Sequence, residues 1–307
     1  MTIINPVELT QLKYFLAVAE TGGFSRAAKR CYVAQPSLSQ QIIKLEKELG
    51  QKLFDRLGRK VTLTEAGSAL LPKAKKILQD INEAKSAVTN ELNQETETLS
   101  IGILPTIAPF LLPVSLNKIQ KKFPAAILNI YENLTDNLIR QLINFEIDIA
   151  IISLPIENSL ISYKHLFNEP MVVSIPKNHP LSKQKYIKSK DLVNLKFIAL
   201  DEENCFGEQV KNFCIEKSLS LNILCKTLNL ATVQNCVAGG SGISVVPSMM
   251  ALADKTGKSV YKNFSDEKPF RTVVSASYKG KSKKRLAEEY ETVLMESFEN
   301  LGGKIPG

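Results

Sequence analysis

The first fifty residues carry apolar side chains at helical spacing, and glycines interrupt the pattern. It predicts a helix over 7–20, a short second helix over 24–30 and a third that begins near Pro36 and ends before Gly50. One face of the third helix is apolar and is expected to be buried: Leu38, Ile42, Leu45 and Leu49. Short hydrogen-bonding side chains on its other face are typical of a helix that reads base edges in a DNA major groove.

Residues 53–64 predict a β-hairpin wing, because two short β-like segments flank a glycine. Arg56, Arg59 and Lys60 in this wing are placed to contact phosphates or the minor groove. The candidate DNA contacts on the two preceding helices are Ser25, Arg26, Gln35, Pro36, Ser37, Ser39, Gln40 and Lys44. Residues 1–64 are therefore expected to form a winged helix-turn-helix DNA-binding domain.

A long helix is predicted over 65–92, followed by a polar hinge over 93–98. Pro72 lies in the early turns of this helix and predicts a kink or a restart. The apolar residues fall near heptad spacing, which suits a two-stranded coiled coil. They are Ala69, Leu70, Ala74, Ile77, Leu78, Ile81, Ala84 and Val88.

Beyond the hinge, short apolar runs alternate with helical patterns. The runs predicted as strands are Leu99–Leu104, Ile127–Tyr131, Asp148–Ile152, Met171–Ile175, Phe197–Leu200, Ile243–Val246 and Val273–Ser277. Alternation of this kind predicts βαβ units and mainly parallel sheets.

The composition of the chain favours DNA as a partner and argues against a membrane protein. The chain has 307 residues, of which 44% are hydrophobic and 23% are charged, as in a folded protein of two or three domains. No stretch is apolar enough to span a membrane and the N-terminus does not resemble a signal peptide, so a cytoplasmic protein without membrane partners is expected. Residues 1–60 contain ten Lys/Arg and five Asp/Glu, a basic excess that favours contact with DNA phosphates.

Several segments of the N-terminal region carry a family resemblance. They include Phe-Ser-Arg-Ala-Ala (24–28), Val-Ala-Gln-Pro-Ser-Leu-Ser-Gln-Gln-Ile (33–42) and Leu-Glu-Lys-Glu-Leu-Gly (45–50). Residues 8–67 resemble the winged helix-turn-helix of LysR-type transcriptional regulators. The resemblance implies a regulator rather than an enzyme, with double-stranded promoter DNA as its partner and RNA polymerase as a further candidate. It also implies a homodimer through the 65–92 helix, which pairs into a homotetramer.

The same resemblance implies a sensory half that is similar to periplasmic binding proteins, with two α/β subdomains joined by two crossovers. The crossovers are expected near Leu166–Pro170 and Asp266–Phe270. Subdomain I then comprises 99–167 plus 270–307, and subdomain II comprises 168–268. The expected fold class is thus mixed α+β and α/β.

Five cysteines are spread through the chain: Cys31, Cys205, Cys214, Cys225 and Cys236. Their odd number and wide spacing argue against a structural disulfide framework. The lack of a Cys-x-x-Cys pair, together with only two histidines, argues against a metal site, and no cofactor is implied. Cys31, Cys225 and Cys236 are expected to pack in the core.

Three stretches of the sensory half, 101–113, 167–171 and 201–214, resemble the peroxide-sensing members of the LysR family. The resemblance implies that Cys205 reacts with hydrogen peroxide and that Cys214 then closes a disulfide. Such a regulator activates oxidative-stress genes. The residues implied to bind peroxide or an effector are Thr106, Thr135, Asn204, Glu208, Gln209 and Arg271.

Peroxide chemistry requires a thiolate, so the pKa of Cys205 is expected to be lowered by a helix N-terminus. The peroxide-sensing members carry His, Arg and Asp where this chain has Asn204, Gly207 and Glu208. Arg271 or Lys211 are the candidate replacements for the lost positive charge. Nine residues of helix extend ~13 Å, whereas a disulfide needs Cα atoms within about 7 Å. Oxidation is therefore expected to unwind the segment between the cysteines.

Two other functions remain open at this point. In the first, the protein is still a LysR-type regulator but its cleft binds a small organic acid and its cysteines are structural. Thr106 would face the cleft in this case as well, and would contact the organic acid. In the second, the protein is a thiol peroxidase that carries a DNA-binding domain, although Gly207 is a poor substitute for the activating Arg of such enzymes.

Overall fold

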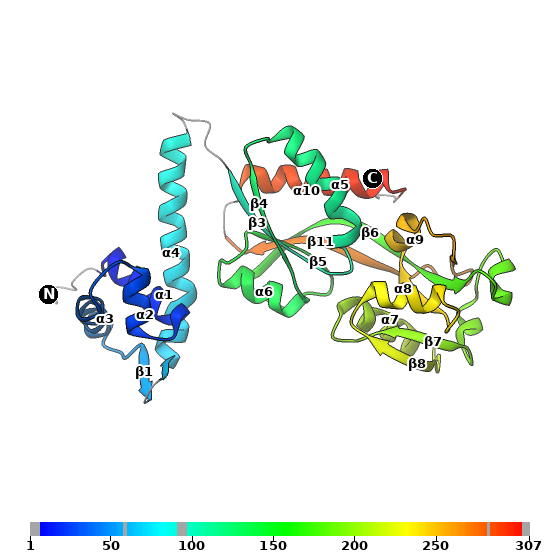
Figure 1. Ribbon diagram of the computed structural model, residues 1–307, viewed down its shortest axis with the longest axis horizontal. Helices are drawn as coiled ribbons and strands as arrows, with labels where there is room; N and C mark the ends of the chain where they lie inside the picture. Colours follow the sequence, from blue (N-terminus) through cyan, green and yellow to red (C-terminus); the bar gives the residue numbers. More distant parts are fainter. Residues whose placement is uncertain (1–6, 58–59, 91–96, 281–282, 303–307) are drawn as a thin grey trace. The chain divides into compact units, whose positions relative to one another are not determined.

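The computed structural model describes residues 7–57, 60–90, 97–280 and 283–302 (Figure 1). The chain divides near residues 95–96 into an N-terminal and a C-terminal compact unit. Within the described ranges, no helix is long and apolar enough to cross a membrane.

The N-terminal unit is a helix-turn-helix with a two-stranded wing and a long helix. Its elements are α1 (Leu9–Thr21), α2 (Phe24–Arg30), α3 (Gln35–Leu49), β1 (Phe54–Leu57), β2 (Lys60–Leu63) and α4 (Glu65–Asn90). The three predicted short helices are confirmed. Gly22 and Gly50 end α1 and α3 in the left-handed conformation, which glycine adopts without steric cost. Leu38, Ile42 and Leu45 are fully buried, but Leu49 is 40% exposed, so its prediction as a core residue is wrong.

The long helix α4 runs without interruption through Pro72, so the predicted restart is wrong. Thr64 caps its start, because the Thr64 hydroxyl accepts a hydrogen bond from the Gly67 amide at 3.0 Å. Leu70, Ala74 and Leu78 from the predicted coiled-coil seam pack on the core of their own unit, whereas Ile77 is 41% exposed. Residues 93–96 of the predicted hinge lie outside the described residues, and Thr98 already belongs to the next strand.

The C-terminal unit is a mixed α/β structure. Its first part contains β3 (Thr98–Ile103), α5 (Ala108–Lys122), β4 (Ile127–Glu132), α6 (Thr135–Ile143), β5 (Ile149–Ser153) and β6 (Ile161–Pro176). Its second part contains the 3-10 helices η1 (Pro180–Lys183) and η2 (Ser189–Leu192), then β7 (Lys196–Leu200), α7 (Cys205–Glu216), β8 (Asn222–Thr227), α8 (Leu230–Ala238), β9 (Ser244–Pro247), α9 (Ser248–Ala253) and β10 (Ser259–Lys262). The chain returns through β11 (Phe270–Tyr278) and α10 (Arg285–Asn300).

The main sheet has the strand order β10-β6-β11-β5-β3-β4, and β9 also pairs with β6. Strand β3 runs parallel to β4 and β5, whereas β11 is antiparallel to β5 and β6, and β9 and β10 are antiparallel to β6. The prediction of a mainly parallel sheet is therefore wrong for the main sheet, because the long strands β6 and β11 pair with antiparallel neighbours. Helices α5 and α10 pack together on one side of this sheet, and α6 covers the other side (Figure 1). Strand β7 pairs in parallel with β8.

Strand β6 connects the two parts of the C-terminal unit. Its first half pairs with β11, and its second half pairs with β9 and β10. The chain thus crosses between the two parts within β6 and again just before β11. The sequence missed β8, β10 and the first half of β6, because their exposed positions break the apolar runs that predict strands.

Candidate functional site

Helix α3 presents polar side chains to solvent in the N-terminal unit. Gln35, Pro36, Ser37 and Gln40 are exposed and Ser39 is half-buried. This polar surface lies opposite the buried Leu38–Ile42–Leu45 face, as a recognition helix requires.

Two of the other predicted DNA contacts have partners of their own. Lys44 donates to Glu8 at 2.6 Å, and this hydrogen bond raises the pKa of Lys44. Arg26 Nε donates to the Thr21 carbonyl at 2.8 Å, while Ser25 is exposed.

Arg56 and Lys60 lie on the paired wing strands β1 and β2, and Arg59 lies outside the described residues. Arg56 and Lys60 therefore belong to the strand pair that follows α3.

Cys205 is the first residue of α7. The buried Asn204 caps the helix, and its Oδ1 accepts a hydrogen bond from the Phe206 amide at 3.1 Å. Gly207 lies against the end of β7, where an added Cβ would stand 2.2 Å from the Asp201 carbonyl oxygen. The start of α7 is therefore held at the carboxyl end of β7, and no side chain fits at position 207.

The Cys205 thiol faces a residue from the other side of the C-terminal unit. Thr135, the first residue of α6, lies near enough for its hydroxyl to lower the pKa of Cys205. The Thr135 Oγ1 is buried and forms no hydrogen bond of normal geometry with any described residue. A buried hydroxyl in this condition is ready to bind a small polar molecule.

A buried network lies behind the thiol. Arg271 Nε donates to Glu169 Oε2 at 2.7 Å, and Arg271 Nη1 donates to the Thr106 hydroxyl at 2.7 Å. Glu169 Oε1 in turn accepts from the Met249 amide at 2.8 Å. The Arg271 guanidinium also lies over the Phe206 ring, 5.1 Å from its centre. The network therefore fixes a positive charge next to the residue that follows Cys205.

The half-buried Cys205 does not have the lowered pKa that peroxide chemistry led us to expect. Burial raises its pKa, and the Glu208 charge raises it further. The positive charge of Arg271, the Thr135 hydroxyl and the Phe206 amide lower the pKa but do not offset burial. Arg271 thus lowers the pKa of Cys205, but by less than burial raises it. The expectation of a lowered pKa for Cys205 is therefore wrong for this reduced form.

Gln209 links α7 to the end of β5. Its Nε2 donates to the Ser153 hydroxyl at 2.9 Å and to the Leu154 carbonyl at 2.7 Å, while its Oε1 is buried without a partner among the described residues. Glu208 is exposed and turns to solvent. The Lys211 Nζ lies 4.0 Å from the Glu202 Oε1. Lys211 is not among the groups that shift the pKa of Cys205.

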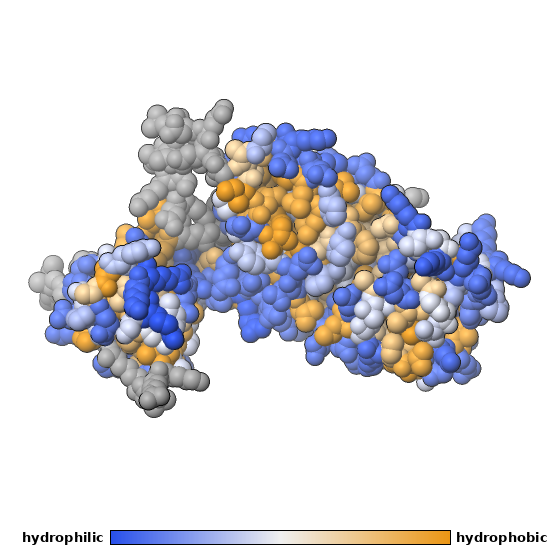
Figure 2. Space-filling view, viewed as in Figure 1, coloured by the Kyte–Doolittle hydropathy of each residue, from blue (hydrophilic) through white to orange (hydrophobic). Residues whose placement is uncertain are grey.

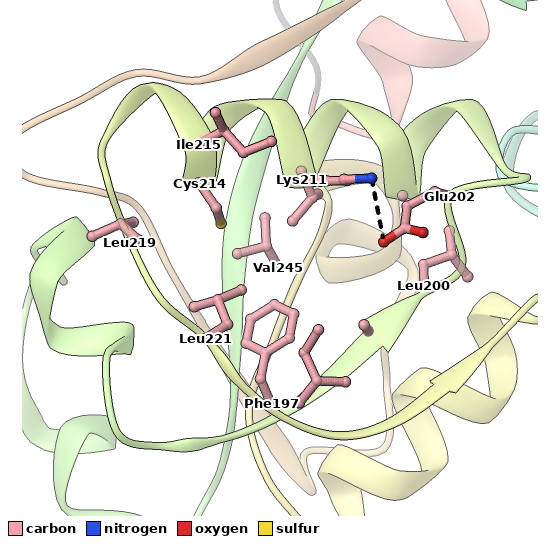
Figure 3. A pocket seen from close by; sticks show the side chains of 13 residues that line it. Phe197, Leu200, Glu202, Lys211, Cys214, Ile215, Leu219, Leu221 and Val245 are labelled. Carbon is pink, nitrogen blue, oxygen red and sulfur yellow. Dashed lines mark ion pairs between the residues drawn. The ribbon is translucent and has the colours of Figure 1, made fainter.

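Cys214 lies near the other end of α7. All five cysteines are free, and burial raises the pKa of Cys214 to about 11. At roughly 100° of rotation per helical residue, nine residues place Cys205 and Cys214 on opposite faces of α7. Cys214 therefore lies on the side of α7 that faces Val245, Leu221 and Phe197 (Figure 3).

The remaining cysteines pack as predicted. Cys31, Cys225 and Cys236 are half-buried against the hydrophobic cores of their units. No cluster of three or more metal-ligating side chains occurs in the parts of the chain that the structure describes.

Family comparison assigns the N-terminal and C-terminal units to one family. The family described as "Bacterial regulatory helix-turn-helix protein, lysR family" matches residues 9–68, and "LysR substrate binding domain" matches residues 92–299. The chain belongs to the LysR family. It is therefore a DNA-binding transcriptional regulator and not an enzyme, and its C-terminal unit has the periplasmic-binding-protein-like fold of LysR sensory domains.

Among curated LysR-family relatives, the peroxide-responsive regulators are similar over most of the chain. The DNA-binding transcriptional dual regulator OxyR of Escherichia coli is 33% identical over 268 residues, 87% of this chain and 88% of the relative. A hydrogen peroxide-inducible genes activator of Dickeya chrysanthemi is 34% identical over 243 residues, 79% of this chain and 80% of the relative.

Solved LysR-family structures resemble the whole chain. A full-length OxyR variant from Pseudomonas aeruginosa shares 32% identity over 95% of each chain, with a TM-score of 0.77. A hydrogen-peroxide-bound OxyR mutant from Corynebacterium glutamicum shares 28% identity over 99% of this chain and 98% of that chain, with a TM-score of 0.64. Full-length BenM shares 26% identity over 97% of this chain and 99% of that chain, with a TM-score of 0.62.

Sequence reasoning missed two contributors to this LysR sensory site, Glu169 and Ser153. Glu169 lies in the Phe-Asn-Glu-Pro-Met segment, directly before an apolar strand half. A carboxylate in a buried strand needs a buried partner of opposite charge. This requirement could have indicated from the sequence that Glu169 pairs with Arg271. Ser153 carries no such signal, because a serine at a strand end is common.

Proposed function

We propose that this LysR-family regulator senses hydrogen peroxide through a reversible Cys205–Cys214 disulfide and activates oxidative-stress genes. One observation carries the proposal: Cys205 lies at the N-terminus of α7, where the buried Thr135 hydroxyl and the Arg271 charge both act on its thiol, with Cys214 on the same helix. The similarity to relatives named as hydrogen peroxide-inducible genes activators supports it.

The chemistry requires only the two cysteines and peroxide. The Cys205 thiolate attacks one peroxide oxygen, the O–O bond breaks, and hydroxide takes up the proton released by the thiol to leave as water. The Cys205 sulfenic acid then reacts with Cys214, the S–S bond forms and a second water leaves. Two thiols are oxidised by two electrons, and one peroxide is reduced to two waters.

Peroxide binding uses the groups around Cys205. The buried Thr135 hydroxyl beside Cys205 supplies one hydrogen bond to a bound peroxide, and the Arg271 charge stabilises the departing hydroxide. Thr106 holds Arg271 in place, and Asn204 and Gln209 hold the start of α7. The exposed Glu208 lies at the edge of this site.

The raised pKa of Cys205 sets the threshold of the proposed response. At neutral pH only a small fraction of the thiol is ionised, so reaction with peroxide is slow compared with a sensor whose cysteine has a lowered pKa. The absence of a side chain at Gly207 contributes, because no basic group can stand there.

Disulfide formation has to remodel α7. The two cysteines lie ~13 Å apart along the helix and on opposite faces, so the helix must unwind between them before their Cα atoms come within about 7 Å. We propose that this order change shifts subdomain II (168–268) against subdomain I (99–167 plus 270–307). Helix α4 then carries the change to the DNA-binding domain (1–64) of a homodimer, and of a homotetramer on promoter DNA next to RNA polymerase.

An organic-acid effector in the same position is less well supported. Recognition of a carboxylate there would use Arg271, but Arg271 is already paired with Glu169 and with Thr106. Binding an anion would break a fully buried ion pair, which costs several kcal/mol.

Thiol mapping by mass spectrometry tests the proposal. Reduced full-length protein is treated with hydrogen peroxide, and a disulfide between Cys205 and Cys214 is expected, with Cys31, Cys225 and Cys236 remaining free. Cys225→Ser is the matched control and should form the same disulfide. Oxidation that proceeds equally well in Cys205→Ser would contradict the proposal.

A further inference from the structure

An apolar cavity of about 220 Å³ lies on the face of α7 that points away from Thr135. Phe197, Leu200, Val210, Leu221 and Val245 line it, and Cys214 forms part of its wall (Figure 3). The neighbouring surface of β8 is also apolar, because Ile223 is 44% and Leu224 is 51% exposed (Figure 2). The cavity therefore opens at an apolar surface and does not belong to the site around Cys205.

One edge of this cavity carries a positive charge that is free to change partner. The ammonium of Lys211 lies at the rim, 4.0 Å from Glu202, and the Lys211 side chain is 53% exposed. Glu202 has a closer partner in Lys226, at 2.8 Å. An anionic group at the rim can thus pair with Lys211 without leaving Glu202 unpaired.

The size and the charge together define the occupant. At roughly 30 Å³ for each water-sized group, 220 Å³ holds about seven such groups. Apolar lining throughout the interior selects a hydrocarbon chain, and a single cation at the rim selects an acidic head group.

The cavity also depends on α7 being helical. Gly207, Val210, Lys211, Cys214 and Ile215 of its lining all belong to α7. Unwinding α7 moves these side chains and removes one wall of the cavity. A molecule in the cavity therefore binds the helical form better than the unwound form, and shifts the equilibrium toward the helix.

We propose that this cavity binds a medium-chain aliphatic carboxylate, with its chain against Cys214 and its carboxylate on Lys211, and that binding opposes oxidation of the regulator. The second half of this inference rests on the proposed peroxide function, and the first half does not.

Calorimetric titration of reduced full-length protein with octanoate, below its micelle concentration, tests the binding. Saturable binding is expected, and 1-octanol should bind about tenfold more weakly because it lacks the charge. Lys211→Gln should weaken the binding of octanoate about tenfold. The control is Lys226→Gln, since Lys226 pairs with the same Glu202 but does not line the cavity. This substitution should change the octanoate affinity less than threefold.

A filling variant gives an independent control. Ala199→Leu places extra carbons in the cavity from β7 and should abolish binding of octanoate and of 1-octanol, with a thermal unfolding transition that remains cooperative. Absence of saturable octanoate binding to the wild type, unchanged binding to Ala199→Leu, or tighter binding of octylamine than of octanoate would each overturn the proposed site.

The effect on oxidation is measured separately. Saturating octanoate should slow Cys205–Cys214 disulfide formation about tenfold in the wild type and leave it unchanged in Ala199→Leu. If octanoate binds but does not slow the disulfide, the regulatory half of the inference is overturned. If no disulfide forms even without octanoate, the proposed peroxide function fails while the binding site stands.

Discussion

Arg271 and Glu169 face each other across the β6–β11 pair and form an ion pair, with 2.6 Å between Arg271 Nη2 and Glu169 Oε2. Neither side chain reaches solvent. Because Arg271 also holds Thr106, in the turn between β3 and α5, and Glu169 holds Met249 on α9, this pair joins the two parts of the sensory unit at the crossover. Burial of two charges is tolerated because each is hydrogen-bonded as well as paired.

Glu169→Gln should destabilise the sensory unit by about 3–5 kcal/mol, because it leaves the Arg271 charge buried without a counterion. Urea denaturation followed by circular dichroism measures the loss. The exposed pair Lys118–Glu296 provides the control, and Glu296→Gln should change stability by less than about 1 kcal/mol. Equal effects of the two substitutions would show that the buried pair contributes no more than a surface pair.

The reactivity of Cys205 should increase with pH well into the alkaline range. Its pKa is raised by burial, so the thiolate is the minor form at neutral pH and its fraction grows about tenfold for each pH unit below the pKa. Alkylation by a small electrophile, quantified for each cysteine peptide by mass spectrometry between pH 6 and 9, measures this. A plateau in the Cys205 rate below pH 8 would mean that Arg271 and the helix dominate over burial.

Gly207→Ala should destabilise the protein by about 2 kcal/mol, since the new Cβ would lie 2.2 Å from the Asp201 carbonyl oxygen and the backbone must move. Thermal and urea unfolding measure the change. Gly239→Ala is the matched control, because its Cβ would lie 3.2 Å from the Asn235 carbonyl oxygen and a smaller movement suffices. An unperturbed Gly207→Ala protein would mean that an arginine can also be accommodated at this position.

Gln209→Ala should loosen α7 in the reduced protein, because it removes the hydrogen bonds to Ser153 and the Leu154 carbonyl. At about 1 kcal/mol, the loss corresponds to roughly fivefold faster local opening. Amide hydrogen exchange of residues 205–216 reports it. Asn212→Ala, an exposed position on the same helix, should leave the exchange unchanged.

Local sequence predicted the elements of the DNA-binding unit closely. The apolar spacing of α1 to α3 and the glycines that end α1 and α3 act over a few residues, so a linear pattern contains the necessary information. The prediction failed at Leu49, and the restart predicted as one outcome at Pro72 does not occur. Leu49 lies on the last turn of α3, where few neighbours cover the helix, and α4 continues through Pro72 although this residue lies inside the helix.

The sequence by itself determined the family of regulators, the alternating α/β order of the sensory half and the pair of cysteines nine residues apart. Only the tertiary structure decided the surroundings of those cysteines. Glu169 and Arg271 are 102 residues apart in the chain and Thr135 precedes both, yet all three act at one thiol or in the network that supports it. Whether burial or nearby charge controls a pKa depends on distances that sequence spacing does not specify.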